Sequence, residues 1–263
     1  MNLDGKRVWL SGASSGIGEE LAKQLAAKGA KLVLSARNEQ ALEQVKNSLM
    51  GQGHVVLPLD LSAAESLLKE LPEQLAAIGD IDILINNGGV SQRSLFADTD
   101  FATYQQLMAV NYFGTVALTK LVVAQMQARK QGMIVAISSV AGKVGSKFRS
   151  GYSGSKYAVV GFMDCIRAEL AADGIHCLTV CPGSVQTRIA HNSLNEKGVA
   201  QNHSEQSIEN GMPVSACVQG IITAIEKQKQ EVVIGQGLSY WAPTIKRFFP
   251  RLFNRLTARL EYR

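Results

Sequence analysis

The sequence has few of the residues that form disulfides or bind metal ions. Its 263 residues include four cysteines and four histidines, and no two cysteines stand in a Cys-x-x-Cys spacing. Cysteines placed in this way are more often reduced, buried thiols than disulfide partners or metal ligands. The histidines occur singly, as His54, His176, His191 and His203. Because a metal site needs several such ligands close together, we predict none.

Long apolar runs are also missing. The longest runs have the length of a strand, whereas a membrane-spanning helix needs ~18 apolar residues or more. Residues 1–7 lead directly into the first predicted strand, so we expect no secretory signal peptide. We therefore expect a cytoplasmic protein, and the basic tail described below leaves a membrane-associated one open.

Most of the chain lacks an excess of charge of either sign. Lysines and arginines number 27 and acidic residues 22, which gives a net charge of +5. From Ser239 onward there are six cations and one acid, so the whole surplus lies in this tail. A groove for nucleic acid would need a cationic patch on the body of the protein. We therefore expect no nucleic-acid partner.

What the sequence does contain is an alternation of short apolar runs with amphipathic segments. Seven runs are predominantly apolar rather than alternating, as parallel strands covered on both faces require. They occupy residues 8–10, 32–34, 55–57, 81–85, 134–137, 177–181 and 232–234. Between them, apolar residues recur every three or four positions, as in Ile17, Leu21 and Leu25, and place one apolar stripe on each helix. This pattern predicts an α/β protein with a single-domain, doubly wound Rossmann-type fold, its seven-stranded parallel sheet covered by helices on both faces.

The same pattern divides the chain into a large domain and a short tail. Residues 1–238 are predicted to form one dinucleotide-binding and catalytic domain, since no linker rich in Pro, Gly or Ser interrupts them. Residues 189–212 are polar and weakly patterned, and we expect them to form a lid over the substrate. Residues 239–263 are predicted to be a basic, amphipathic helical segment.

A glycine-rich turn follows the first predicted strand. Residues 11–18 read Ser-Gly-Ala-Ser-Ser-Gly-Ile-Gly, a G-x-x-x-G-x-G spacing that differs from the G-x-G-x-x-G of many dinucleotide sites. Glycines allow close approach of the backbone, and the free N–H groups of a helix start face negative charge. Such a turn alone leaves a structural role open. Its place after the first strand of an α/β chain favours a dinucleotide.

The second predicted strand is followed by a cation. Chains that bind NAD usually carry an acid near this point, whereas a cation suits the 2′-phosphate of NADP. Arg37 offers a planar guanidinium for that phosphate. Glu39 lies nearby, but Asn38 and Glu39 are better explained as the cap and first turn of the next helix. We predict NADP(H), with NAD and a purely solvent-exposed Arg37 as the alternatives.

Four polar residues form a candidate catalytic group: Asn111, Ser139, Tyr152 and Lys156. Tyr152 and Lys156 are four positions apart and share one face of a helix, although such pairs are common by chance. Ser139 follows the fifth apolar run, where strand ends line the ligand crevice. A cation ~4 Å away at an effective dielectric of ~20 contributes ~4 kcal/mol, or ~3 pKa units. We therefore expect Lys156, helped by the positive nicotinamide ring of the oxidised cofactor, to lower the pKa of Tyr152 toward neutrality.

Together these motifs resemble the short-chain dehydrogenase/reductase family, and most closely its membrane-associated branch related to the hydroxysteroid dehydrogenases. The resemblance extends to about residue 235. The four polar residues match the family's catalytic tetrad in order. Asn-Asn-Gly-Gly at residues 86–89 matches the family's Asn-Asn-Ala-Gly, and Gly88 is a departure expected to loosen that turn slightly.

The resemblance also implies a set of cofactor-binding residues. Asp60 matches the acid near the adenine, and Thr187 matches the hydroxyl that holds the nicotinamide carboxamide. The implied set is Gly12, Ser14, Ser15, Gly16, Ile17, Gly18, Arg37, Asp60, Leu61, Asn87, Gly88, Tyr152, Lys156, Pro182, Gly183, Val185 and Thr187.

The activity implied by the resemblance is the NADP(H)-dependent interconversion of a carbonyl and a secondary alcohol. Tyr152 would be the general acid in reduction and the base in oxidation, and Ser139 would hydrogen-bond the substrate oxygen. Lys156 would bind the ribose hydroxyls, and Asn111 would hold a water. The lid residues favour a small, lipophilic substrate without separating a steroid from a retinoid, an acyl chain or a xenobiotic ketone.

Two other classes of protein remain as alternatives. A cofactor-sensing protein would keep the glycine-rich turn but would not need all four tetrad residues. A serine hydrolase has little support, because Gly-Tyr-Ser-Gly-Ser at residues 151–155 is not a G-x-S-x-G motif.

The tail and the predicted Tyr152 helix raise the question of partners. Arginines recur every four residues from Arg247 to Arg263, beside apolar residues spaced by three and four, and Pro250 suits a first helical position. Such a helix either docks on an anionic membrane surface or packs on its own domain or a second subunit. The predicted helix at residues 152–172 is apolar on more than one side, which favours a homodimer or homotetramer.

Overall fold

The computed structural model describes residues 1–187, 189, 192–201 and 210–259. It contains one seven-stranded sheet whose strands all pair in parallel. The strands are β1 (Arg7–Ser11), β2 (Lys31–Ser35), β3 (Val55–Val56), β4 (Ile83–Asn86), β5 (Gly132–Ile137), β6 (Ile175–Pro182) and β7 (Glu231–Ile234). The predicted seven-stranded parallel sheet is confirmed.

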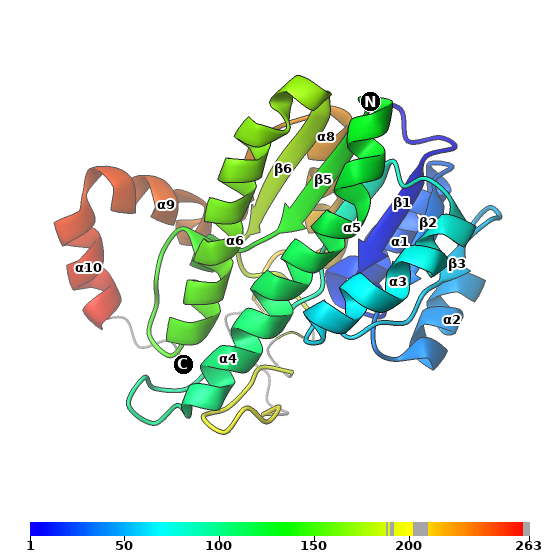
Figure 1. The fold of residues 1–263 in the computed structure, drawn as a ribbon. Coiled ribbons are helices and arrows are strands. Elements are labelled where there is room, and N and C mark those ends of the chain that lie inside the picture. Colours follow the sequence, from blue (N-terminus) through cyan, green and yellow to red (C-terminus); the bar gives the residue numbers. More distant parts are fainter. Residues whose placement is uncertain (188, 190–191, 202–209, 260–263) are drawn as a thin grey trace.

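Helices connect the strands and surround the sheet (Figure 1). They are α1 (Gly16–Ala27), α2 (Glu39–Asn47), α3 (Ala64–Ile78), α4 (Phe101–Met108), α5 (Gly114–Arg129), α6 (Ser150–Glu169), α8 (Val214–Glu226), α9 (Leu238–Phe248) and α10 (Pro250–Arg259). Three short helical segments complete the described chain, namely η1 (Ala109–Phe113), η2 (Val140–Gly142) and η3 (Ala171–Asp173).

The strand order decides where a ligand can bind. It runs β3-β2-β1-β4-β5-β6-β7, so the chain reverses its direction of winding between β1 and β4. In open parallel sheets, the loops at the carboxyl ends of the strands separate at such a switch point and leave a crevice. The glycine-rich turn follows β1 and the Asn-Asn-Gly-Gly stretch begins at the end of β4. The topology therefore places both motifs at the crevice.

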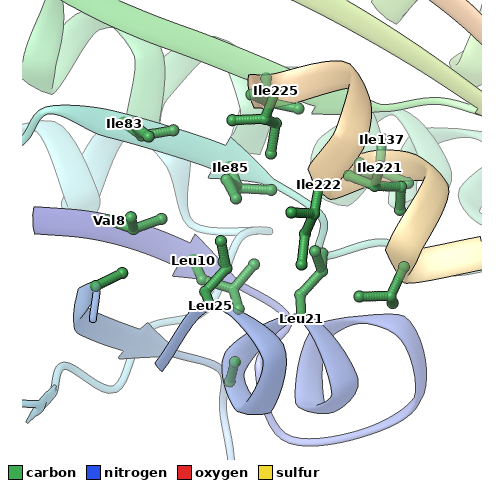
Figure 2. Packing of buried hydrophobic residues seen from close by; sticks show 14 of the residues in the cluster. Val8, Leu10, Leu21, Leu25, Ile83, Ile85, Ile137, Ile221, Ile222 and Ile225 are labelled. Carbon is green, nitrogen blue, oxygen red and sulfur yellow. The ribbon is translucent and has the colours of Figure 1, made fainter. Parts of the chain in front are cut away.

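One face of the sheet packs against α1, α2 and α8. Val8 and Leu10 of β1 belong to this layer with Leu21 of α1 and Ile221 of α8, and all of them are fully buried. Figure 2 shows the side chains of β1 and β4 meeting those of α1 and α8. Each buried aliphatic side chain contributes about 1.5–3 kcal/mol by leaving water. This layer fixes the base of the glycine-rich turn.

The opposite face packs against α3, α5 and α6. Trp9, the residue between Val8 and Leu10, points to this side and is fully buried with Leu118 and Met163. Its indole Nε1 donates a hydrogen bond of 2.9 Å to Ser35 Oγ. Alternate side chains of β1 thus pack into the core layers on opposite faces of the sheet, which explains why residues 8–10 are all apolar.

The longest helical stretch runs from Phe101 to Arg129 and combines α4, η1 and α5. Among the described residues it is the one helix long and apolar enough to cross a membrane by length and composition, which the short apolar runs did not anticipate. Leu118 and Val122 of this stretch are fully buried in the core layer of α3 and α6. Buried core helices commonly meet the same criteria of length and composition, so we regard the stretch from Phe101 to Arg129 as a core helix of the α/β fold.

The C-terminal segment contains the basic helix expected to begin at Pro250, preceded by a second helix that the sequence did not predict. The segment forms two helices, because the helical conformation is interrupted at Phe249, between the end of α9 and the start of α10 at Pro250. Proline is favoured at the first position of a helix, where its missing N–H has no partner to lose. Ala242 and Phe253 pack with Val140 and Val144 in a small separate cluster. Leu260 and Arg263 of the expected stripe lie outside the described residues.

Candidate active site

A cavity of about 1240 Å³ opens at the carboxyl ends of the central strands. It is large enough for a dinucleotide and a second small molecule together, since drug-sized ligand sites occupy about 300–1,000 Å³. The predicted site residues on its wall are Gly12, Ser14, Ser15, Gly16, Ile17, Arg37, Asp60, Leu61, Asn87, Gly88, Ser139, Tyr152, Lys156, Pro182, Gly183, Val185 and Thr187. Gly18 and Asn111 are buried behind this wall.

The glycine-rich turn leads into the start of α1. Ser15 is the N-cap residue, and its side chain makes no capping hydrogen bond. The first N–H groups of the helix therefore keep their capacity to bind an anion at the cavity wall. Gly18 lies beneath the turn, where an added Cβ would stand 2.0 Å from the carbonyl oxygen of Gly12. The absence of a side chain at Gly18 therefore lets α1 approach the glycine-rich turn closely. Gly18 itself does not line the cavity.

The Asn-Asn-Gly-Gly turn is tightly held, contrary to the loosening expected from Gly88. Ser11 Oγ accepts hydrogen bonds of 3.1 Å from the N–H groups of both Asn87 and Gly88. Asn87 Nδ2 donates to the carbonyl oxygens of Ser11 and Gly12, also at 3.1 Å. A Cβ on Gly88 would stand 2.5 Å from a methyl group of Leu61. Leu61 therefore packs against Gly88 in the space that a Cβ would need. The hydrogen bonds join the Asn-Asn-Gly-Gly turn to the glycine-rich turn.

Arg37 and Asp60 lie on the rim of the cavity. Arg37 is exposed, and within the described part of the chain it forms no ion pair. Asn38 is the N-cap of α2 and accepts a hydrogen bond from the N–H of Ala41, as predicted. Asp60 Oδ1 accepts hydrogen bonds from the N–H and the hydroxyl of Ser62, at 2.9 and 2.8 Å. An unpaired guanidinium on the cavity rim is available for an anionic ligand.

Ser139, Tyr152 and Lys156 come together on the wall of the cavity. Tyr152 and Lys156 project from the first turns of α6, while Ser139 follows β5 and caps η2 by accepting from the N–H of Ala141. Tyr152 and Lys156 are each 5% exposed. Helix and strand end thus converge on one point, which the sequence spacing alone did not establish.

Burial changes the ionisation of both α6 residues. It raises the pKa of Tyr152, and a hydrogen bond from Ser139 opposes this effect without cancelling it. Burial also lowers the pKa of Lys156 to about 8. Lys156 Nζ donates a hydrogen bond of 2.9 Å to the carbonyl oxygen of Ile137 and lies 6.0 Å from the centroid of the Tyr152 ring. In the protein alone, desolvation therefore outweighs the effects that lower the pKa of Tyr152. The lowering expected from Lys156 together with an oxidised nicotinamide stays a prediction.

Asn111 lies in the π-helical segment η1 and joins the Asn-Asn-Gly-Gly loop to α6. Its Oδ1 accepts a hydrogen bond of 2.8 Å from the N–H of Val90. Its Nδ2 donates to the carbonyl oxygen of Val90 and to Ser155 Oγ, both at 2.9 Å. Ser155 in turn donates to the carbonyl oxygen of Tyr152. π-Helical segments often occur at functional sites, and here the segment turns the amide toward the loop and the helix.

Gln92 is a positioning residue that the sequence did not reveal. It is fully buried, and its Oε1 accepts hydrogen bonds from the N–H groups of Gly151 and Tyr152 at 2.8 and 3.2 Å. These N–H groups begin α6, whose N-cap residue Arg149 makes no side-chain capping bond. Gln92 Nε2 donates to Ser94 Oγ. Because this cap comes from a distant part of the chain, no local capping pattern marks it.

The substrate end of the cavity has two walls. Ile189, Asn192 and Leu194 of the predicted lid line it, whereas residues 188, 190–191 and 202–209 of that region lie outside the described residues. Leu194 pairs with the strand-like stretch around Gln92 through backbone hydrogen bonds. The second wall was not predicted and belongs to the C-terminal helices, through Leu238, Ala242, Ile245, Phe253 and Leu256.

The fold and the cavity together define a doubly wound α/β protein whose ligand crevice holds a tyrosine, a lysine and a serine. Within the described chain, no three His, Cys, Asp or Glu side chains gather as metal ligands do. Tyr152 offers proton transfer and Ser139 offers hydrogen bonding, next to a helix start suited to phosphate.

Comparisons with known proteins agree with this description. A family model described as short chain dehydrogenase matches residues 6–198. Human dehydrogenase/reductase SDR family member 7 is 43% identical over 238 residues, covering 87% of this chain and 70% of its own length. Mouse dehydrogenase/reductase SDR family member 7B is 38% identical over 257 residues, covering 95% and 80%. The chain therefore belongs to the short-chain dehydrogenase/reductase family of oxidoreductases, and these relatives are consistent with its membrane-associated branch.

Solved structures show the same fold. A short-chain dehydrogenase from Burkholderia cenocepacia, in complex with NADP, has a TM-score of 0.80 at 24% identity and covers 97% of this chain and 99% of its own. A short-chain dehydrogenase/reductase from Burkholderia phymatum, in complex with NAD, has a TM-score of 0.81 at 21% identity and covers 100% and 98%. At these identities the likeness concerns the fold.

Proposed function

We propose that the protein is an NADP(H)-dependent oxidoreductase that interconverts a carbonyl and a secondary alcohol on a lipophilic substrate. The observation that carries the proposal is the convergence of Ser139, Tyr152 and Lys156 on the same cavity as the glycine-rich turn. A dinucleotide at the turn would extend along the carboxyl edge of the sheet toward these residues.

The residues of the cavity fit a nicotinamide dinucleotide. The uncapped start of α1 suits a pyrophosphate, because its N–H groups and helix dipole favour negative charge. Structures with this fold bind NADP in one case and NAD in another, so the fold does not choose between them. Arg37 supports NADP, since its guanidinium lies on the cavity rim, forms no ion pair within the described chain and would suit the 2′-phosphate of the adenosine ribose.

The bound cofactor would supply or accept the hydride, and side chains of the protein would donate or accept the proton. Tyr152 would donate the phenolic proton to the carbonyl oxygen in reduction and recover it from the hydroxyl in oxidation. Ser139 would hydrogen-bond the same oxygen and hold it beside the phenol. Lys156 would bring a cation to the cofactor side of Tyr152, where it favours the phenolate that proton transfer leaves behind.

The walls of the substrate end support a lipophilic substrate. Leu238, Ala242, Ile245 and Phe253 form one side and Leu194 another. Burying apolar ligand area against these walls makes the free energy of binding more favourable by about 25 cal/mol per Å². The walls therefore favour a carbonyl attached to a hydrocarbon skeleton over a charged or sugar-like substrate.

Replacement of Tyr152 by Phe tests the proposal. The variant removes one oxygen atom, so we expect NADPH to bind within about twofold of wild type while turnover falls by about a hundredfold or more. Binding is measured by NADPH fluorescence, and turnover by NADPH oxidation with benzil, 2-decanone and a 3-ketosteroid. Tyr112→Phe is the matched control, because Tyr112 lies outside the cavity wall.

The same experiment separates the alternatives. Near-normal turnover in Tyr152→Phe would refute the assignment of the general acid. Tight NADPH binding by wild type, without oxidation in the presence of any ketone in the panel, would instead indicate a cofactor sensor.

A further inference from the structure

The chain enters α6 through a strained backbone conformation. Phe148, two residues before the helix begins at Ser150, has a positive φ of 66°. A bulky residue is rarely found in this left-handed region, and it persists there only where the surrounding structure holds it. Strain of this kind is concentrated at functional sites. The residues that Phe148 positions are therefore candidates for a role in the cavity.

The segment that follows β4 holds Phe148 in this conformation. The carbonyl oxygen of Phe148 accepts a hydrogen bond of 3.0 Å from the N–H of Ser94. The guanidinium of Arg93 lies over the Phe148 ring, 5.0 Å from its centroid, as in a cation–π contact. The backbone N–H of Arg93 also donates to Leu194, which lines the substrate end of the cavity. The entry into α6 is thus fixed at the substrate end.

Arg149, the residue after Phe148, lies on the cavity wall beside Tyr152. Its carbonyl oxygen accepts a hydrogen bond of 2.7 Å from the N–H of Ser153, which ties Arg149 to the first turn of α6. Arg149, Tyr152 and Lys156 are separated by three and four positions, and all three line the cavity. Residues at this spacing follow one face of a helix. Tyr152 therefore lies between a guanidinium on the substrate side and an ammonium on the other side.

The position of Arg149 does not serve the helix itself. A cation at the N-terminus of a helix meets the positive end of the helix dipole, which is unfavourable. The acceptor that caps α6 comes from Gln92, and the Arg149 side chain makes no capping hydrogen bond. A sequence that breaks a local rule in this way is expected at a functional site. The location of Arg149 is explained by the cavity better than by the stability of α6.

Arg149 is also the group near Tyr152 whose charge does not depend on pH. Within the described chain, the ionisable groups that face Tyr152 are Arg149, Lys156 on α6 and Cys181 on β6. Burial raises the pKa of Cys181 to about 12 and lowers that of Lys156 to about 8. The thiol is therefore neutral in the ordinary assay range, and Lys156 loses its charge on the alkaline side of neutrality. A guanidinium stays protonated throughout.

We infer that Arg149 is a second cation of the active site, which favours the phenolate form of Tyr152 from the substrate side and thereby promotes oxidation of an alcohol. Phenolate is the form that accepts the hydroxyl proton in oxidation. Arg149 acts through Tyr152 and is a positioning residue. Its effect on oxidation rests on the proposed function, whereas its effect on the ionisation of Tyr152 does not.

The pH profile of alcohol oxidation tests this role. Reduction of NADP⁺ is followed with benzoin, 2-decanol and a 3-hydroxysteroid in wild type and in Arg149→Met, which removes the charge and keeps an apolar stem. We expect the rise of kcat with pH to move to higher pH by at least about 0.5, and kcat at pH 7 to fall at least about threefold, because a nearby cation favours the phenolate. The KM for the alcohol should stay within about twofold of wild type.

Two further variants separate the charge of Arg149 from other effects. Arg149→Lys keeps a cation and should restore most of the wild-type profile. Lys147→Met is the matched control, because it removes an exposed cation that does not line the cavity, and it should leave the profile unchanged. An equal displacement in Lys147→Met, or no restoration by Arg149→Lys, would overturn the inference. A raised KM for the alcohol with an unmoved profile would show that Arg149 binds substrate instead.

Fluorine NMR measures the ionisation of Tyr152 without turnover. The tyrosines are replaced biosynthetically by 3,5-difluorotyrosine, a more acidic phenol, and the resonance of Tyr152 is identified by its loss in Tyr152→Phe. In the protein without cofactor, Arg149→Met should raise the pH midpoint of this resonance by at least about 0.5, and Lys147→Met should not change it. Equal midpoints in wild type and Arg149→Met would overturn the inference. A raised midpoint without oxidation of any alcohol by wild type would disprove the proposed function and leave the effect of Arg149 on Tyr152 intact.

Discussion

At the scale of single residues, burial controls the chemistry of Tyr152 and Lys156. Both side chains are almost fully enclosed, and desolvation makes the charged form of each less favourable. A neutral phenol is the form that a general acid needs for carbonyl reduction. In the proposed reaction, the cavity would therefore keep the proton on Tyr152 until a substrate oxygen accepts it. Burial lowers the pKa of the neighbouring Lys156 to about 8.

The depressed pKa of Lys156 predicts how stability changes with pH. Between its folded-state pKa of about 8 and its ordinary value of 10.5, the unfolded chain binds more protons. The contribution of Lys156 to the free energy of unfolding therefore increases as pH rises through this window, by about 2 kcal/mol between pH 7 and 9.5.

Urea unfolding of wild type and Lys156→Met without cofactor measures this contribution. The difference between the two proteins removes the titration of Tyr152 and the cysteines, which are present in both. Wild type should gain stability relative to the variant as pH rises from 7 to 9.5. A difference that stays constant, or that moves in the opposite direction, would show that Lys156 is not desolvated.

Arg37 predicts cofactor choice. Arg37→Ala removes the guanidinium that would hold the 2′-phosphate, and a hydrogen bond to a charged group contributes about 1.5–3 kcal/mol. We expect NADPH binding to weaken about tenfold to a hundredfold while NADH binding stays unchanged, as measured by fluorescence titration. Arg255→Ala is the control, because Arg255 lies outside the cavity. An equal loss for both cofactors would remove the basis for preferring NADP.

At the scale of the elements, the start of α6 depends on a residue from another segment. Gln92 supplies the acceptor for the N–H groups of Gly151 and Tyr152, which the local sequence leaves uncapped. An unsatisfied buried donor costs about 1–3 kcal/mol. The orientation of Tyr152 in the cavity is therefore tied to the loop that follows β4.

Two substitutions of Gln92 separate positioning from general instability. Gln92→Met keeps the length and removes the acceptor, so we expect kcat to fall about tenfold or more with little change in KM for NADPH. Gln92→Glu keeps an acceptor at the same position and should restore most of kcat. If Glu fails to rescue while the thermal stability of both variants equals that of wild type, Gln92 does not position Tyr152.

The elements also show what the sequence predicts well. The seven apolar runs each correspond to a strand, because a strand covered on both faces is mainly apolar. The helix begins at Pro250 as expected, since proline favours a first helical position. The cap from Gln92 and the π-helical turn at Asn111 were not predictable, because both depend on contacts between segments far apart in the sequence. The same is true of the pKa values, which depend on burial.

At the scale of the whole molecule, the strand order brings the motifs together. The glycine-rich turn, the Asn-Asn-Gly-Gly turn and Ser139 all follow strands at the same edge of the sheet. This gathering was predictable from the α/β alternation. The apolar wall contributed by α9 and α10 was not predictable, because a basic amphipathic segment gives no indication of which surface its apolar side covers.

The central claim is that hydride passes directly between a nicotinamide and a carbonyl carbon at the point where Tyr152 supplies the proton. It is tested with NADPH carrying deuterium at C4, prepared separately on each face of the ring, with benzil as substrate and mass spectrometry of the alcohol formed. We predict one deuterium per product molecule, on the former carbonyl carbon, from only one of the two labelled cofactors. A product without deuterium from either cofactor, or with equal label from both, would contradict the claim.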